Sequence, residues 1–168
     1  MRPCPLGYDD MERRALVTYT HRCVGCRICE QWCSLEHGGT MNPARSRITV
    51  HRDHRQCANI PVACSQCTKA PCVTACNFDA LKRDPVTGGL LLDADACVGC
   101  RLCLEVCPRG VIKMDADAGV PLVCDLCGGN PQCVRHCAEA AVQYLELDKL
   151  DTGYRQAYVK SVMRREGK

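Results

Sequence analysis

The sequence predicts an α+β fold of short strands and single helical turns, and the placement of its cysteines is the main reason. Sixteen of the eighteen cysteines fall into four groups of four. Short runs of β-forming residues flank the groups, and the gap between the third and fourth cysteine of a group has room for one helical turn and no more. A unit of strand, loop, helical turn and strand therefore occurs about twice along the chain.

The spacing within the groups is typical of iron–sulfur ligands. The groups are Cys23, Cys26, Cys29 and Cys33; Cys64, Cys67, Cys72 and Cys76; Cys97, Cys100, Cys103 and Cys107; and Cys124, Cys127, Cys133 and Cys137. The first and third read C-x2-C-x2-C-x3-C, as in bacterial ferredoxins, where the fourth cysteine ligates the neighbouring cluster. Sixteen thiolates match four [4Fe–4S] clusters with none left over. The repeated unit is therefore ferredoxin-like, and a chain this rich in redox centres is expected to move electrons.

Other uses of the cysteines fit less well. Structural zinc sites use two C-x2-C pairs separated by a longer loop, a pattern that groups two and four could be forced into but groups one and three could not. Haem attachment needs a histidine after C-x2-C, and Arg27, Thr68, Arg101 and Gly128 stand there instead. A thioredoxin-type pair would stand alone, and none does. A disulfide framework is disfavoured because nothing like a signal peptide precedes the cysteines.

Composition limits the remaining function classes. Only seven residues are aromatic, so clusters are expected to supply much of the interior, and the chain without metal is expected to be largely unfolded. The formal charge of +3 would fall to roughly −5 with four oxidised clusters of about −2 each, which gives nucleic-acid binding little support. No stretch approaches a membrane span. We expect a cytoplasmic protein, or one exported on a partner that carries the signal.

Some residues stand apart from the four groups. Cys4 and Cys57 lack the spacing for a fifth site and are interpreted as incidental thiols. The five histidines are read as residues around the clusters or on the surface. Two histidines and three arginines are placed to donate hydrogen bonds to cluster sulfur: His21, His136, Arg27, Arg101 and Arg135. No catalytic motif is present, so the chain is not expected to be an enzyme by itself.

Four groups in this order resemble the four-cluster polyferredoxins, the iron–sulfur electron-transfer subunits of the dimethyl sulfoxide reductase and formate dehydrogenase type. That family includes small partners of hydrogenases and of tungsten- or molybdenum-dependent enzymes. The resemblance spans roughly residues 17–147, in CVGCRICEQWC (23–33), CSQCTKAPCVTAC (64–76), CVGCRLCLEVCP (97–108) and CDLCGGNPQCVRHC (124–137). The stretch NPARSRITV (42–50) is similar to the small polyferredoxin subunit of tungsten-dependent aldehyde oxidoreductases.

The resemblance implies that groups pair as first with fourth and second with third. It places one cluster on Cys23, Cys26, Cys29 and Cys137, one on Cys124, Cys127, Cys133 and Cys33, one on Cys64, Cys67, Cys72 and Cys107, and one on Cys97, Cys100, Cys103 and Cys76. The family often has proline after the last cysteine of a group. Here only Cys107 keeps it, and Ser34, Asn77 and Ala138 stand at the other three positions.

The expected organisation is two nested bacterial ferredoxin-like lobes with added segments. The expected parts are an irregular N-terminal arm (1–14), a first lobe (15–33 with 111–147), an insertion (34–57), a second lobe (58–110) and a C-terminal helix or tail (148–168). Strands are expected at 15–20, 47–50, 89–93, 111–114 and 142–147. The chain also lacks the membrane-anchoring tail of many family members, which suggests a soluble complex.

The expected function is that of an electron-transfer subunit. The resemblance implies a catalytic partner with a tungsten or molybdenum pterin, and a flavoprotein linked to NAD(P) or a ferredoxin as the other redox partner. Copies of the chain could also associate end to end. The alternatives are a free-standing polyferredoxin, a subunit of a hydrogenase or formate dehydrogenase and, from another class, an iron–sulfur sensor. A sensor should carry an output element such as a helix-turn-helix, and none is found.

Overall fold

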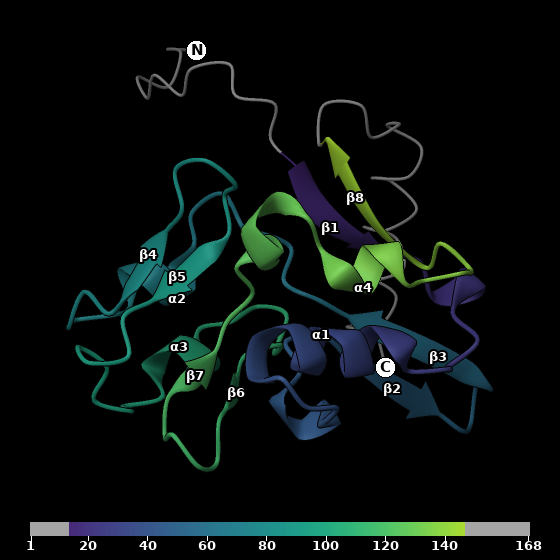
Figure 1. Ribbon diagram of the computed structural model, residues 1–168, viewed down its shortest axis with the longest axis horizontal. Helices are drawn as coiled ribbons and strands as arrows, with labels where there is room; N and C mark the ends of the chain where they lie inside the picture. The colour runs from purple at the N-terminus through teal and green to yellow at the C-terminus, as the bar shows by residue number, and fades with distance from the viewer. Residues whose placement is uncertain (1–13, 147–168) are drawn as a thin grey trace, which may run out of the picture.

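A computed structural model describes residues 14–146 (Figure 1). The strands in this part of the chain form four two-stranded antiparallel sheets. These are β1 (Arg14–Thr18) with β8 (Val142–Glu146), β2 (Thr49–Asp53) with β3 (Ala58–Val62), β4 (Leu81–Arg83) with β5 (Leu90–Leu92), and β6 (Lys113–Met114) with β7 (Pro121–Leu122). The first sheet joins the two ends of the described chain, because Thr18 pairs with Val142 and Arg14 with Glu146.

Each of four helices carries the third cysteine of a group as its second residue. The helices are α1 (Ile28–Gly38), α2 (Pro71–Thr74), α3 (Leu102–Glu105) and α4 (Gln132–Arg135). The expected single turn is confirmed for α2, α3 and α4 but is wrong for α1, which has 11 residues. In the other groups a residue with positive φ turns the chain shortly after the last cysteine: Asp79, Gly110 and Ala140. After Cys33 the first such residue is Gly39, whose N–H closes the helix on the Leu35 carbonyl.

The apolar interior consists of two clusters of buried residues, here called the first core and the second core. The first core joins the first and fourth cysteine groups and contains Leu16, Cys29, Cys33, Ile48, Val50, Ala63, Leu126, Cys133 and Val142. The second core joins the second and third groups and contains Cys72, Leu81, Leu90, Cys103, Val111, Ile112 and Val123. In Figure 1 the elements of the first core gather on the right and those of the second on the left. The Leu90 N–H donates to the Cys124 carbonyl at 2.9 Å and so links the two.

The predicted strands are largely confirmed, with shifted ends. β2 begins two residues later than expected and runs into a segment that reads as polar. The strands β3, β4 and β7 were not predicted, because β4 and β7 are very short and both β3 and β7 contain proline, which is confined to edge strands. The β2–β3 hairpin crosses the expected limit between residues 57 and 58. The expected N-terminal arm, apart from Arg14, and the expected C-terminal helix lie outside the described residues.

Candidate metal centre

The loops between the first two cysteines of each group share one backbone feature. The residue before the second cysteine has positive φ in all four: Gly25 (74°), Gln66 (45°), Gly99 (69°) and Leu126 (60°). Glycine adopts this conformation without cost, whereas Gln66 and Leu126 hold it as buried residues, 4% and 0% exposed. The turn folds each loop back on itself, so that its thiols face a common space.

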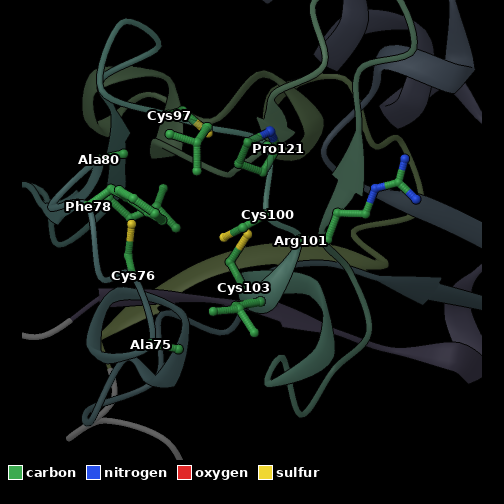
Figure 2. A pocket seen from close by; sticks show the side chains of 13 residues that line it. Ala75, Cys76, Phe78, Ala80, Cys97, Cys100, Arg101, Cys103 and Pro121 are labelled. Atoms are coloured by element: carbon green, nitrogen blue, oxygen red, sulfur yellow. The ribbon is translucent and has the colours of Figure 1, made fainter.

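One cavity is lined by cysteines of groups two and three. Figure 2 shows Cys97, Cys100 and Cys103 beside Cys76, with their sulfur atoms directed into the same space. Phe78 and Pro121 complete the wall. Three thiols thus come from one loop and the fourth from the end of the other group.

Two further cavities repeat the arrangement of three thiols plus one. Cys64, Cys67 and Cys72 line the first of these with Cys107. The second is lined by four cysteines of groups four and one: Cys124, Cys127, Cys133 and Cys33. In both, the single thiol comes from the group that shares the same core.

The remaining four cysteines influence one another's pKa values, which indicates that they lie close together. The pKa of the Cys29 thiol is raised to about 12, mainly by burial and also by negative charge at Glu30, Cys137 and Cys23. Burial likewise raises the pKa of Cys23, with contributions from Cys26 and Cys137. Cys137 therefore lies close to the thiols of the first group, although it is remote in sequence.

The buried thiols are poorly suited to carry charge without a cation. Burial raises the pKa of Cys64 to about 11 and that of Cys124 far above its ordinary value, where negative charge at Cys64 adds to the effect. A bound metal reverses this preference, because a coordinating thiol is deprotonated outright. All cysteines in the described chain are free thiols, and thiolates in sets of four are the donors that [4Fe–4S] clusters require. The four sets of cysteine thiols therefore fit [4Fe–4S] clusters.

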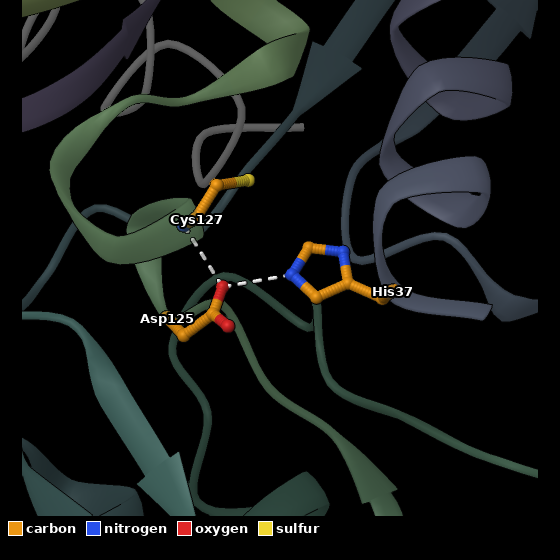
Figure 3. Close-up of side chains that lie close together, drawn as sticks. All are labelled: His37, Asp125 and Cys127. Atoms are coloured by element: carbon orange, nitrogen blue, oxygen red, sulfur yellow. Dashed lines mark hydrogen bonds and ion pairs between the residues drawn. The ribbon is translucent and has the colours of Figure 1, made fainter. Parts of the chain in front are cut away.

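A polar contact that sequence reasoning had not singled out lies beside one of these sets (Figure 3). His37 Nε2 is 2.9 Å from Asp125 Oδ1, and His37 Nδ1 is 2.7 Å from the Cys33 carbonyl. Asp125 Oδ1 also accepts the Cys127 backbone N–H at 3.0 Å. The available signal was spacing: His37 lies four residues after Cys33, which is one turn of a helix, but no helix was expected there.

The other predicted neighbours of the clusters have different contacts. His136 stacks on Trp32 with ring centroids 3.6 Å apart, and His21 meets the edge of Tyr19 at 5.8 Å. Arg27 donates to the Val50 carbonyl at 3.3 Å. Hydrogen bonds from His21, His136, Arg27, Arg101 and Arg135 to cluster sulfur therefore stay predictions. Cys57 is exposed in the β2–β3 turn and lines none of the three cavities, and Cys4 lies outside the described residues.

Comparison with known proteins agrees with the donor chemistry. Residues 55–147 match the 4Fe–4S dicluster domain. The chain belongs to this family. A relative 41% identical over 152 residues, covering 89% of this chain and 86% of its own length, is the polyferredoxin-like subunit of an aliphatic sulfonate oxidoreductase from Pyrococcus furiosus.

Two further relatives of this chain come from enteric bacteria. The putative electron transport protein YsaA of Escherichia coli is 32% identical, and the alignment covers 82% of this chain and 92% of YsaA. The thiosulfate reductase electron transfer subunit PhsB of Salmonella typhi is 30% identical, with 76% and 73% covered. Within the described residues, no helix has the length and apolar character needed to cross a bilayer.

Proposed function

We propose that this chain is the electron-transfer subunit of an oxidoreductase complex and carries four [4Fe–4S] clusters. The observation that supports this best is that three cavities are each lined by four cysteines, three from one group and one from its partner group. The same pattern of three plus one is the ligand arrangement of two-cluster ferredoxins.

The proposed ligand sets keep that crossed pairing, in two nested ferredoxin-like lobes. They are Cys23, Cys26, Cys29 and Cys137; Cys33, Cys124, Cys127 and Cys133; Cys64, Cys67, Cys72 and Cys107; and Cys76, Cys97, Cys100 and Cys103. When bound, each cluster accepts and passes on one electron. The positive-φ loops hold the thiols in place, and five of the sixteen ligands are buried in the two cores.

The exposed ligand cysteines are the places where redox partners can approach. Among the proposed ligands these are Cys26 and Cys100, whereas the third cysteine of each group is buried. Val24, 62% exposed, and Val98, 60% exposed, lie in the same loops. Apolar surface beside each exposed ligand cysteine supports docking of a redox partner at each of the two loops.

The partners are inferred from the resemblance and from the relatives. A catalytic subunit would hold the substrate chemistry, which we propose takes place at a tungsten or molybdenum pterin. A flavoprotein or ferredoxin would exchange electrons at the other exposed cysteine loop. Two relatives are named as subunits of oxidoreductases, which supports a role that depends on a partner and not on catalysis by this chain.

The test is metal content combined with two matched ligand variants. Anaerobically purified protein should contain about sixteen irons and sixteen sulfides per chain, since each of four cubes holds four of each. Cys137→Ala should damage the cluster built on Cys23, Cys26 and Cys29, and Cys107→Ala the one built on Cys64, Cys67 and Cys72. Electron paramagnetic resonance (EPR) of the reduced protein should show a different signal altered in each variant. Zinc in place of iron, or a Cys137→Ala signal identical to that of Cys133→Ala, would contradict the assignment.

A further inference from the structure

Two basic side chains, Arg47 and His37, line the cavity of Cys33, Cys124, Cys127 and Cys133. Among the described residues, the other two cavities are lined by arginines and by no histidine. The Arg47 backbone N–H donates to Cys33 Sγ at 3.2 Å, and His37 Nδ1 lies 4.0 Å from the same sulfur. Two basic residues therefore stand against one proposed ligand.

The Arg47 guanidinium has donors to spare. Its Nε and Nη1 are buried, and neither has a hydrogen-bond partner among the described residues. Nη1 lies 3.8 Å from Asp125 Oδ2, which is an ion pair but too long for a hydrogen bond. Arginine remains charged in proteins, so these N–H groups are cationic donors beside the cavity. In the cavity of Cys64, Arg83 donates to the carbonyls of Cys67 and Gly88, and Arg109 also lines the wall.

His37 adds a second basic side chain beside the cavity. Its two ring nitrogens face the Cys33 carbonyl and the Asp125 carboxylate. Asp125 also forms the ion pair with Arg47, so it holds both side chains in place beside the cavity.

Both residues reach this position through the segment that departs from the ferredoxin pattern. Helix α1 continues past Cys33 and brings His37 one turn further along, where the other groups turn away. The loop after the helix returns Arg47 to Cys33 before β2 begins. The insertion thus supplies both side chains to this cluster site.

We propose that Arg47 and His37 raise the reduction potential of the cluster held by Cys33, Cys124, Cys127 and Cys133, with Asp125 as a positioning residue. This inference rests on the proposed function. Positive charge and hydrogen bonds to sulfur favour the reduced cluster, which carries one more negative charge. The cluster at this site then holds an electron more readily than its four thiolates alone would allow.

The experiment is an anaerobic redox titration of the full chain, monitored by EPR, on charge variants with a matched control. The variants are Arg47→Gln, Arg47→Lys and His37→Gln. The control is Arg45→Gln, which removes an equal charge two residues away, where Arg45 pairs with Asp115 at 2.8 Å outside the cavity. Cys33→Ser identifies the signal of the cluster in question.

The expected result is a selective shift. Arg47→Gln should lower the midpoint potential of the signal that Cys33→Ser alters by about 59 mV or more, which is a tenfold change in a one-electron equilibrium. His37→Gln should shift the same signal in the same direction, Arg47→Lys should shift it less, and Arg45→Gln should leave it unchanged. Iron content should equal that of the wild type in all four.

Three outcomes would overturn the inference. These are unshifted potentials in both Arg47→Gln and His37→Gln, an equal shift in Arg45→Gln, and loss of a quarter of the iron in Arg47→Gln and His37→Gln, which would mark a purely structural role. A wild-type protein without iron–sulfur signals would refute the proposed function and the inference with it. Intact signals with unshifted potentials would refute the inference alone.

Discussion

The first and second cores differ in the segment that follows the last cysteine of a group, Cys33 in the first core and Cys76 in the second. After Cys76 the chain turns at Asp79, where φ is 51°, and enters the short strand β4. After Cys33 it continues in α1, and the β2–β3 hairpin comes before group two begins. In both cores, three thiols of one cysteine group nevertheless face a single thiol of the partner group. The second core reaches this arrangement without a long helix or a hairpin of five-residue strands, so the additional helix and hairpin of the first core are not required for it.

Removal of iron should produce the largest difference in stability between the two cores. The second core depends on strands of two and three residues, which cannot persist without the clusters, whereas the first core also has an 11-residue helix and two sheets of five-residue strands. Chelation of iron under anaerobic conditions should abolish amide protection from hydrogen exchange in β4–β7 and leave residual protection in α1 and β2–β3. Equal loss of protection in both cores would show that the extra elements add no independent stability.

A smaller and more local effect is expected at Glu30. This side chain is 2% exposed, and its Oε1 accepts the buried Val50 N–H at 2.5 Å, which fastens α1 to the hairpin. Glu30→Ala leaves that N–H without an acceptor and should lower the free energy of local opening in β2–β3 by about 1–3 kcal/mol. Hydrogen exchange of the Val50 N–H measures this free energy of opening. Glu30→Gln keeps an acceptor and should retain most of the protection, and an equal change in β4–β5 would argue against a local role.

The smallest effect should be seen at Cys57. The residue is exposed in the β2–β3 turn and contacts neither core. Cys57→Ser should therefore leave iron content and all EPR signals unchanged. Loss of about four irons in this variant would mean that the hairpin contributes a ligand, and the separation between hairpin and thiol sites would no longer hold.

The sequence was informative where chemistry is local and less so where it depends on contacts across the chain. Strands with apolar or aromatic residues, such as β5 (LLL) and β8 (VQYLE), could be predicted from composition, because such residues favour a half-buried strand. The length of α1 was missed because the prediction considered only the gap between Cys29 and Cys33, which has room for one turn, whereas the helix continues past Cys33. His37 and Arg47 were not singled out, since their role depends on a helix end and a returning loop that bring residues of groups one and four together.

The β1–β8 sheet has a consequence for synthesis on the ribosome. β1 is among the first described segments to be made, but its partner β8 is the last, and Cys137 comes shortly before it. The first sheet cannot close until almost all of this region has left the exit tunnel. Under the proposed ligand sets, the cluster of Cys23, Cys26 and Cys29 has to wait equally long for Cys137. The thiols of groups two and three are complete well before that. Maturation is therefore expected to begin in the middle of the chain, and the N-terminal cysteines must stay reduced and unoccupied while they wait for the C-terminal part of the fold.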